Sequence, residues 1–134
     1  MNIFDKLSEL TPVIFPEFYT VTDKSGNEFV LLKDGELIDN LEKTIDDKTA
    51  FEAFINHFHI FDKIPKDKTE EAFVFGKKTA ENFYGILKRL YPDKKFYVYL
   101  IFNPKESTIV RFHQAWDGEY PYYFPSDDVF IISE

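Results

Sequence analysis

Cysteine is absent from this sequence of 134 residues. Its absence excludes disulfide bonds and thiolate metal sites, and it favours a reducing compartment, so we expect a cytoplasmic protein. Long apolar runs are also missing, because no stretch approaches the roughly 20 residues that span a bilayer. The first ten residues include acidic side chains and lack a basic segment followed by an apolar run. We therefore expect neither a signal peptide nor a membrane partner.

Basic residues are scarce, since 16 Lys and Arg stand against 24 Asp and Glu and give a net charge of −8. This balance disfavours nucleic acid as a partner, because phosphates are bound by basic surfaces. Residues 1–47 hold 11 acidic and 4 basic residues, and residues 112–134 hold 5 acidic residues and no Lys or Arg. The charge serves solubility alone, or it forms an acidic face for a basic protein.

Aromatic residues, in contrast, are abundant at 19% of the chain, and hydrophobic residues make up 44%. This composition argues against disorder. A chain of this length buries roughly two thirds of its unfolded surface, which is enough for one core. We therefore expect a single domain over residues 1–134.

Alternating side chains and turn residues predict five strands. Residues 18–23 and 28–33 form one hairpin around a Ser-Gly-Asn turn, and residues 96–102 and 107–113 form a second one around Asn-Pro-Lys. Residues 128–133 form a last strand. Strands therefore cluster towards both ends of the chain, with the helices between them.

Helical spacing of apolar residues predicts a short helix up to Leu10, capped by Asn2 and ended by Pro12. It also predicts a helix over residues 48–60, in which Phe51, Phe54, Ile55 and Phe58 form one apolar stripe, and a helix over residues 69–90. The acidic residues 36–47 form a short helix or an irregular connection. The pattern as a whole predicts an α+β fold, in which a mainly antiparallel sheet of about five strands packs against two or three helices.

The only candidate site lies at the end of the second hairpin. Because strand side chains alternate between faces, Val110 and Phe112 belong to the core, whereas Arg111 and His113 share the other face with tyrosines. A loop covers this face, or it stays open as a concavity. The residues predicted to meet a partner are Arg111, His113, Gln114, Trp116, Asp117, Glu119, Tyr120, Tyr97 and Tyr99.

Three interpretations of this cluster remain open. In the first, Arg111 pairs with Asp117 or Glu119 and His113 binds backbone, so that the cluster only braces the loop of a structural or accessory domain. In the second, Trp, Tyr and Arg form a protein-binding surface, because these residues are enriched at binding hot spots. In the third, Arg111, His113 and Glu119 serve a small enzyme or ligand-binding domain, although no nucleophile motif accompanies them.

Neither a metal nor a cofactor is expected. His57 and His59 are two positions apart on the predicted helix 48–60, and such side chains point in different directions. No phosphate-binding or calcium-binding motif is complete. We therefore predict a protein that is not an enzyme.

The stretch Arg111–Glu119, R-F-H-Q-A-W-D-G-E, resembles a recurring tail of small cytosolic bacterial proteins. On these residues the chain resembles the immunity proteins of bacterial contact-dependent and polymorphic toxin systems. The resemblance implies a small acidic α+β protein that blocks a toxin domain by stoichiometric binding. It assigns no role to single residues, because such families share neither one fold nor one site. The expected partner is a basic toxin domain, and a homodimer is an alternative use of the exposed surfaces.

Overall fold

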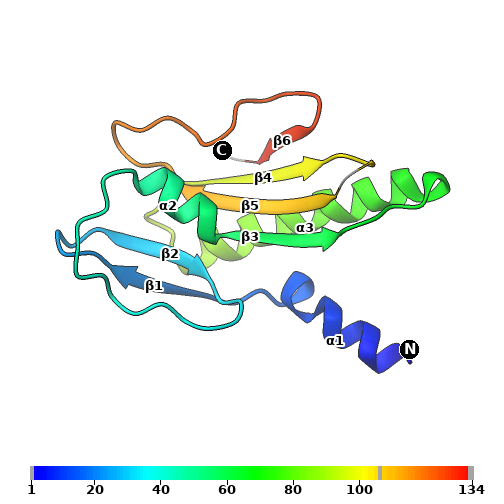
Figure 1. Cartoon of the computed structure of the whole chain (residues 1–134), viewed down its shortest axis with the longest axis horizontal. Coiled ribbons are helices and arrows are strands. Elements are labelled where there is room, and N and C mark those ends of the chain that lie inside the picture. Colours follow the sequence, from blue (N-terminus) through cyan, green and yellow to red (C-terminus); the bar gives the residue numbers. More distant parts are fainter. Residues whose placement is uncertain (1, 106, 133–134) are drawn as a thin grey trace.

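The computed structural model describes residues 2–105 and 107–132, in which helices pack on antiparallel sheets (Figure 1). The helices are α1 (Ile3–Ile14), α2 (Lys48–Ile55) and α3 (Thr69–Leu90), and a short 3-10 helix precedes α3 at Lys66–Lys68. The strands are β1 (Phe18–Thr22), β2 (Glu28–Leu32), β3 (His57–Phe61), β4 (Phe96–Phe102), β5 (Thr108–Gln114) and β6 (Val129–Ile132). The α+β class is confirmed. None of the described helices is long and apolar enough to span a membrane.

The strands of the described residues form two antiparallel sheets, where we predicted a single sheet of about five strands. β1 and β2 pair with each other, and the larger sheet has the order β3-β5-β4-β6. In its centre Val98 lies opposite Phe112 and Tyr99 lies opposite Arg111. The predicted alternation of β4 and β5 is therefore confirmed, and it places Arg111 and His113 on the face away from the main core.

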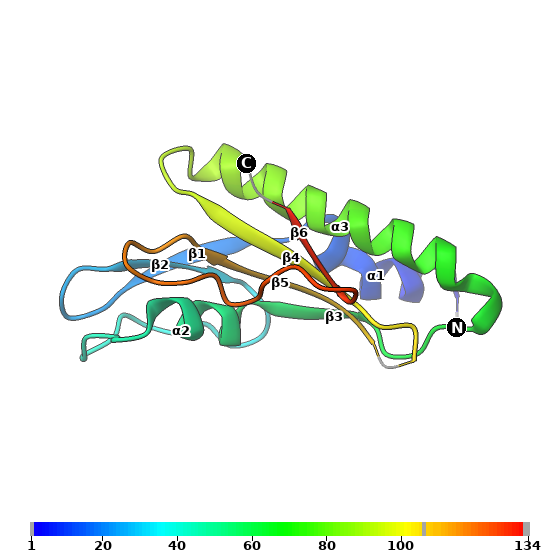
Figure 2. The same ribbon diagram turned by 90° about the horizontal axis from the view of Figure 1, so that it is seen from above.

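Helix α3 covers one face of the larger sheet (Figure 2). It has the predicted bounds, and Ala80, Phe83 and Leu87 on its apolar side are fully buried. Gly76 permits close packing, because a Cβ at this position would lie 2.9 Å from Leu100 Cδ1. The sheet contributes alternate side chains to this main core, namely Phe96, Val98, Leu100, Phe102, Val110 and Phe112.

The β1–β2 hairpin packs on both sides: Val30 and Leu32 join the main core, where the Phe18 ring lies 5.8 Å from that of Phe83, and the opposite face packs on α2 (Figure 2). Val21, Phe29 and Leu31 form a second, smaller core there. The acidic connection over residues 33–47 is irregular, which decides between the two predicted alternatives. Asp23 holds its end in place by accepting a hydrogen bond from the backbone of Ile45 at 3.0 Å.

Helix α2 connects the two sheets through the residue that follows it. The side chain of Asn56 accepts a hydrogen bond from Leu32 N (2.8 Å) and donates one to Val30 O (2.8 Å). Its backbone carbonyl accepts a hydrogen bond from Phe112 N (3.0 Å). Asn56 therefore occupies the position of a strand between β2 and β5.

The predicted helix over residues 48–60 is wrong in its second half. The chain leaves the helix after Ile55, and His57–Phe61 becomes the edge strand β3, paired with β5. Phe54, which we placed on the apolar stripe, is exposed. The backbone N–H and C=O groups of this segment form hydrogen bonds with β5 in place of helical ones. Tertiary context therefore overrides the helical spacing of the apolar residues.

The first helix extends past the predicted end at Leu10. Asn2 caps it as predicted, with Oδ1 accepting a hydrogen bond from Asp5 N at 2.9 Å. Pro12 nevertheless lies inside the helix, which ends at Ile14. Proline lacks one helical donor but its fixed φ suits a helix, and burial of Val13 against the domain offsets the lost bond.

Candidate functional site

The segment that follows β5 returns across the polar face of the larger sheet. Tyr122 N donates a hydrogen bond to His113 Nε2 at 3.1 Å, and the Tyr123 ring packs edge-on against Tyr99 with centroids 5.1 Å apart. We predicted that the face of Arg111 and His113 is either covered by a loop or open, and the structure shows that it is covered. The covering segment, residues 115–127, is called the bracing loop below.

His113 is buried and has partners at both ring nitrogens. Nδ1 donates to Gln114 O at 2.6 Å, because Nε2 must be unprotonated to accept from Tyr122 N. The Tyr99 hydroxyl also donates to Nε2, at 2.8 Å. Burial lowers the pKa of His113, while burial raises the pKa of Tyr99 to about 12, so the imidazole is neutral and the phenol keeps its proton.

Arg111 holds α2 and the bracing loop together. Its guanidinium donates to the backbone carbonyl of Ala53 in α2 and lies 5.4 Å from the centroid of the Tyr122 ring. Among the described residues it pairs with neither Asp117 nor Glu119, so the ion pairs considered in the bracing interpretation are wrong. A carbonyl and an aromatic ring take their place.

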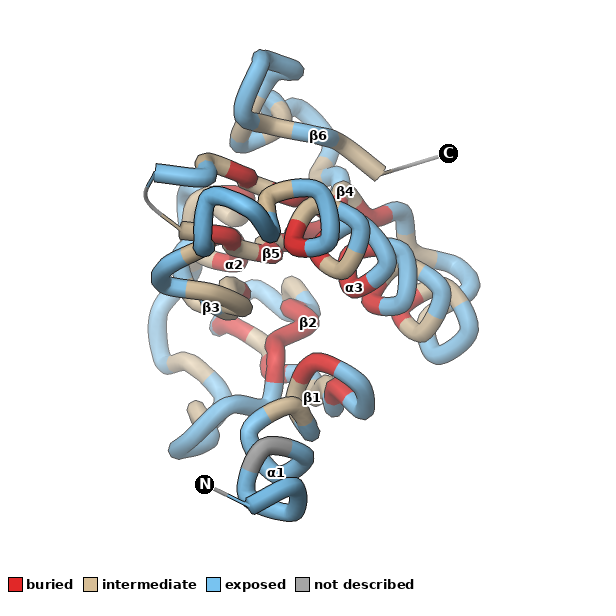
Figure 3. Tube along the Cα trace, turned by 90° about the vertical axis from the view of Figure 1, so that its right-hand side faces the viewer, coloured by how far each residue is buried: buried red, intermediate tan, exposed pale blue. Residues whose placement is uncertain are grey.

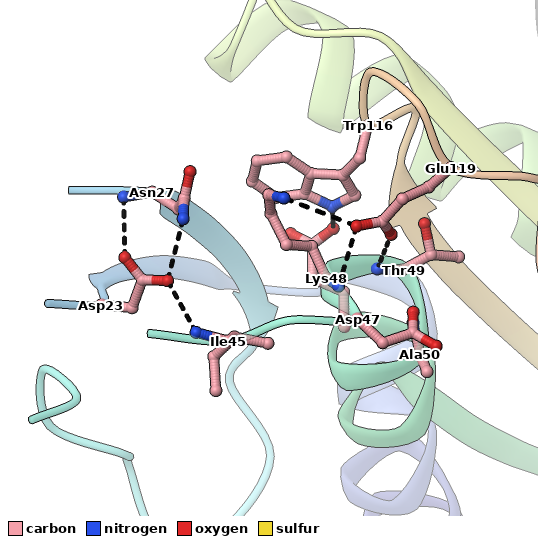
Figure 4. A network of polar contacts seen from close by, with 10 residues as sticks. Asp23, Asn27, Ile45, Asp47, Lys48, Thr49, Ala50, Trp116 and Glu119 are labelled. Carbon is pink, nitrogen blue, oxygen red and sulfur yellow. Dashed lines mark hydrogen bonds and ion pairs between the residues drawn. The ribbon is translucent and has the colours of Figure 1, made fainter. Parts of the chain in front are cut away.

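Glu119 binds the start of α2 (Figure 4). Its carboxylate accepts hydrogen bonds from Thr49 N at 2.7 Å and Lys48 N at 3.1 Å, and it lies 3.5 Å from Lys48 Nζ. Asp47 caps the same helix by accepting from Ala50 N at 2.9 Å. Burial alone would raise the pKa of Glu119, but these hydrogen bonds and the Lys48 charge lower it. Glu119 is therefore an ionised helix cap.

Sequence reasoning missed Glu52, the acceptor at the centre of this side of the molecule. Its buried carboxylate accepts from Val30 N, Gln114 N, Gln114 Nε2 and Trp116 Nε1, at distances between 2.7 and 2.9 Å. Burial raises the pKa of Glu52, whereas the four donors lower it, and burial is the larger effect. One signal was available, since Glu52 interrupts the apolar run Ala50–Ile55.

Trp116 is therefore an internal anchor of the bracing loop. Besides its bond to Glu52, its ring packs against Phe29 with centroids 5.2 Å apart, and Lys48 Nζ lies 5.6 Å from its centroid. Gln114 is buried and also donates to Glu28 O at 2.9 Å. These contacts fix the loop on both β2 and α2.

The nine predicted site residues thus divide by accessibility. Tyr99, His113 and Gln114 are buried; Tyr97, Arg111, Trp116 and Glu119 are half-buried; Asp117 and Tyr120 are exposed. His113, Arg111 and Glu119 hold different structural partners, and Glu119 alone of the three lines the groove described next. These three side chains therefore do not converge on one reaction centre, and their geometry does not support the catalytic interpretation.

A groove of about 530 Å³ lies between the start of α2 and the tip of the bracing loop. We call it the α2 groove. Tyr120, which is 82% exposed and is the most exposed large hydrophobic side chain among the described residues, stands on its loop side. Its lining residues are Asp46, Asp47, Thr49, Ala50, Glu119, Tyr120, Pro121 and Tyr122.

The two histidines predicted at a helix end lie instead on β3. Their rings are 5.5 Å apart, and His57 Nδ1 contacts Phe54 O at 2.9 Å. Both border a cavity of about 330 Å³ that also includes Asp34 and Glu36. Across residues 2–105 and 107–132, no group of three or more metal-ligating side chains is placed to hold an ion.

The fold and the site together define a small α+β domain whose buried polar network fixes one surface loop. Residues 13–126 match the family described as the Uncharacterized protein PM0498 family. Because the match covers most of the chain, the protein belongs to this family. No curated protein and no solved structure matches the chain.

Proposed function

We propose that the chain is a protein-binding domain that holds a basic segment of its partner in the α2 groove. The observation that carries this proposal is the position of Asp46 and Asp47 in the same groove as the exposed Tyr120. Carboxylates attract Lys or Arg side chains, and an aromatic face adds a cation–π contact. The groove therefore offers a basic side chain two kinds of favourable contact.

The net charge of the chain supports the same partner. A charge of −8 increases the rate of encounter with a basic protein and slows encounter with an acidic one. The uneven distribution of this charge matters as well, because the acidic segments 1–47 and 112–134 both contribute to the groove. Association should therefore weaken as salt concentration rises.

The bracing loop supports binding by being fixed before the partner arrives. Arg111 and His113 attach it to β5 through Tyr122, and Glu119 attaches it to the start of α2. A loop that is already ordered loses less conformational entropy on association, so more of the contact energy appears as affinity. In this proposal the buried part of the predicted site positions the groove, and Tyr120 and the acidic residues meet the partner.

The partner class that we propose is the one expected from the sequence, a basic toxin domain neutralised by stoichiometric binding. A binding protein of this kind needs complementary charge and aromatic anchors, and it needs no catalytic group. If the toxin form of the proposal holds, toxin activity should fall to zero at one equivalent of the protein. Activity that persists at saturation would overturn this form and leave the binding proposal intact.

The experiment that tests binding compares three tagged proteins: wild type, the double variant Asp46→Lys with Tyr120→Ala, and Glu81→Lys. Glu81 is an exposed acid of α3, so its reversal is a control for net charge outside the groove. A captured partner is identified by mass spectrometry and purified, and its affinity for each protein is then measured.

We expect the double variant to weaken binding by at least roughly 100-fold, because hot-spot residues contribute 2 kcal/mol or more. Glu81→Lys should weaken it by less than about threefold, through long-range charge alone. An acidic partner, or equal affinity for both variants, would contradict the proposal.

A further inference from the structure

Helix α1 exposes an apolar stripe that the rest of the domain does not cover. Ile3 is 65% exposed, Phe4 75% and Leu7 48%. The helix is attached at its C-terminal end, where Val13 is buried and Asn82 Nδ2 donates to Ile14 O at 3.2 Å. Figure 3 shows it reaching away from the domain with exposed residues along most of its length.

The spacing of this stripe is that of a helix–helix interface. Ile3, Leu7, Leu10 and Ile14 follow one another at intervals of four, three and four residues, the pattern with which one helix packs along another. Leu10 is half-buried, and Ile14 is 41% exposed. A helix of 12 residues is marginally stable in water without tertiary packing. An apolar seam at this spacing would supply that packing.

A groove lies beside the C-terminal end of α1, and we call it the α1 groove. It has a volume of about 530 Å³ and is bordered by Ile14 and Phe15 of the helix end and by Leu37, Ile86 and Leu90 of the domain. Leu37 and Leu90 are about half exposed. The apolar surface of the stripe therefore continues onto the domain.

We propose that two copies of the chain pair antiparallel through α1, around a two-fold axis. In this register Ile3 of one helix lies opposite Ile14 of the other, and Leu7 lies opposite Leu10. In such a pair the same flank of each helix faces that of the other. Phe4 lies on the same flank as Phe15, so Phe4 of each copy covers the α1 groove of the second copy. The contact is self-complementary, as a two-fold interface requires.

The polar side of α1 indicates that the stripe binds a second copy of the chain rather than a membrane surface. Helices that lie on anionic bilayers carry Lys and Arg on their polar face. The polar residues of α1 are Asp5, Lys6, Ser8, Glu9 and Thr11, so a single Lys stands against two acidic residues and the helix lacks a basic face. The proposal is also independent of the proposed function, because none of the residues that line the α2 groove belongs to α1.

Sedimentation equilibrium tests the pairing. We expect wild type to have twice the chain mass, and Leu7→Glu to dissociate roughly 100-fold more easily, because it places a carboxylate in an apolar seam. Glu9→Lys changes the charge by two units on the side of the helix far from the seam, and it should remain a dimer. Far-UV circular dichroism of both variants verifies that they are folded.

Cysteine cross-linking tests the direction of the pair, and the absence of natural cysteine makes the experiment clean. Ile3→Cys and Ile14→Cys proteins are oxidised separately and as a mixture. Antiparallel pairing predicts a disulfide-linked dimer in the mixture alone, because Ile3 of one copy lies beside Ile14 of the other.

Four results would overturn the proposal. One is a wild-type monomer at the highest soluble concentration, and a second is equal mass for Leu7→Glu and Glu9→Lys. The third is a cross-link in either single variant alone, which requires a different arrangement. Binding of monomeric wild type to anionic vesicles, abolished by Leu7→Glu, would assign the stripe to a membrane and likewise reject the dimer.

Discussion

The two faces of the larger sheet are stabilised in different ways. On the α3 face, Phe83, Leu87 and their neighbours are buried against the sheet in an apolar core. On the α2 face, Glu52, Asn56 and His113 are buried too, but each forms several directed hydrogen bonds. Apolar packing depends mainly on volume, whereas hydrogen bonds require fixed distances and directions. The α2 face can therefore fix the position of a loop that an apolar core would leave less defined.

Among the changes that test this difference between the faces, loss of the Glu52 acceptor should reduce stability most. Glu52→Gln places an amide N–H₂ among four N–H donors, so buried donors lose their acceptor. We expect unfolding free energy to fall by about 4 kcal/mol. Urea unfolding measures it, with the exposed Glu81→Gln as a control that should change by less than about 0.5 kcal/mol. Equal stability of the two variants would refute a central role for Glu52.

Leu87→Ala tests the apolar face with a smaller expected effect. Leu87 is fully buried, and its truncation leaves a cavity between α3 and the sheet. We expect a loss of about 3 kcal/mol in urea unfolding. The near-UV circular dichroism of Trp116 should stay unchanged in Leu87→Ala and should change in Glu52→Gln. A changed Trp116 signal in both variants would mean that the two faces are not independent.

Two glycines of α3 sharpen the picture of the apolar face. Gly85 is exposed with open space around its Cβ position, so Gly85→Ala should raise stability by about 1 kcal/mol through helix propensity. At Gly76 a Cβ would lie 2.9 Å from Leu100, and Gly76→Ala should therefore give no such gain. Thermal unfolding of both variants checks the difference. Stabilisation by both would show that α3 can move away from the sheet.

His113 should make folding stability depend on pH below neutrality. At neutral pH it should have no such effect. Burial lowers the pKa of His113, so above about pH 6.5 the residue is neutral in both folded and unfolded states. As pH falls below that value the unfolded chain takes up the proton first, and stability is lost until the pH passes the folded pKa. Urea unfolding between pH 7.5 and 5 should show this loss in wild type, beyond that of His113→Leu. A loss of equal size in the two proteins would exclude His113 as its source.

Local patterns predicted the parts of the fold that local interactions determine. The helix 69–90 and the hairpin of β4 and β5 have strong periodicity and clear turns, and both are confirmed. The face assigned to Arg111 and His113 is confirmed for the same reason, because alternation along a strand follows from backbone geometry. β3 was missed, because Phe51, Phe54, Ile55 and Phe58 also fit a helix and only pairing with β5 decides between the two.

The candidate site was predicted in its residues and only partly in its contacts. Glu119 and His113 do hold the bracing loop, but Glu119 does so through a partner far away in the chain, since Thr49 lies 70 positions from it. Glu52 reaches Gln114 across 62 positions. Such pairs cannot be found from spacing, because one chain contains many acids and many donors. The α2 groove was missed for the same reason, since Asp46 and Tyr120 meet only in the folded molecule.

The position of Asn56 and Glu52 between β2 and β5 has a consequence for how the chain folds. The β1–β2 hairpin and the β4–β5 hairpin each form from neighbouring residues, which is fast. Joining them requires α2 to bring two side chains into register with both strands at once, and Gln114 then reaches Glu28 across 86 positions. Closing such long loops costs entropy before any of these bonds forms. Docking of the first hairpin should therefore be the late, slow step, and Trp116 is placed to report it.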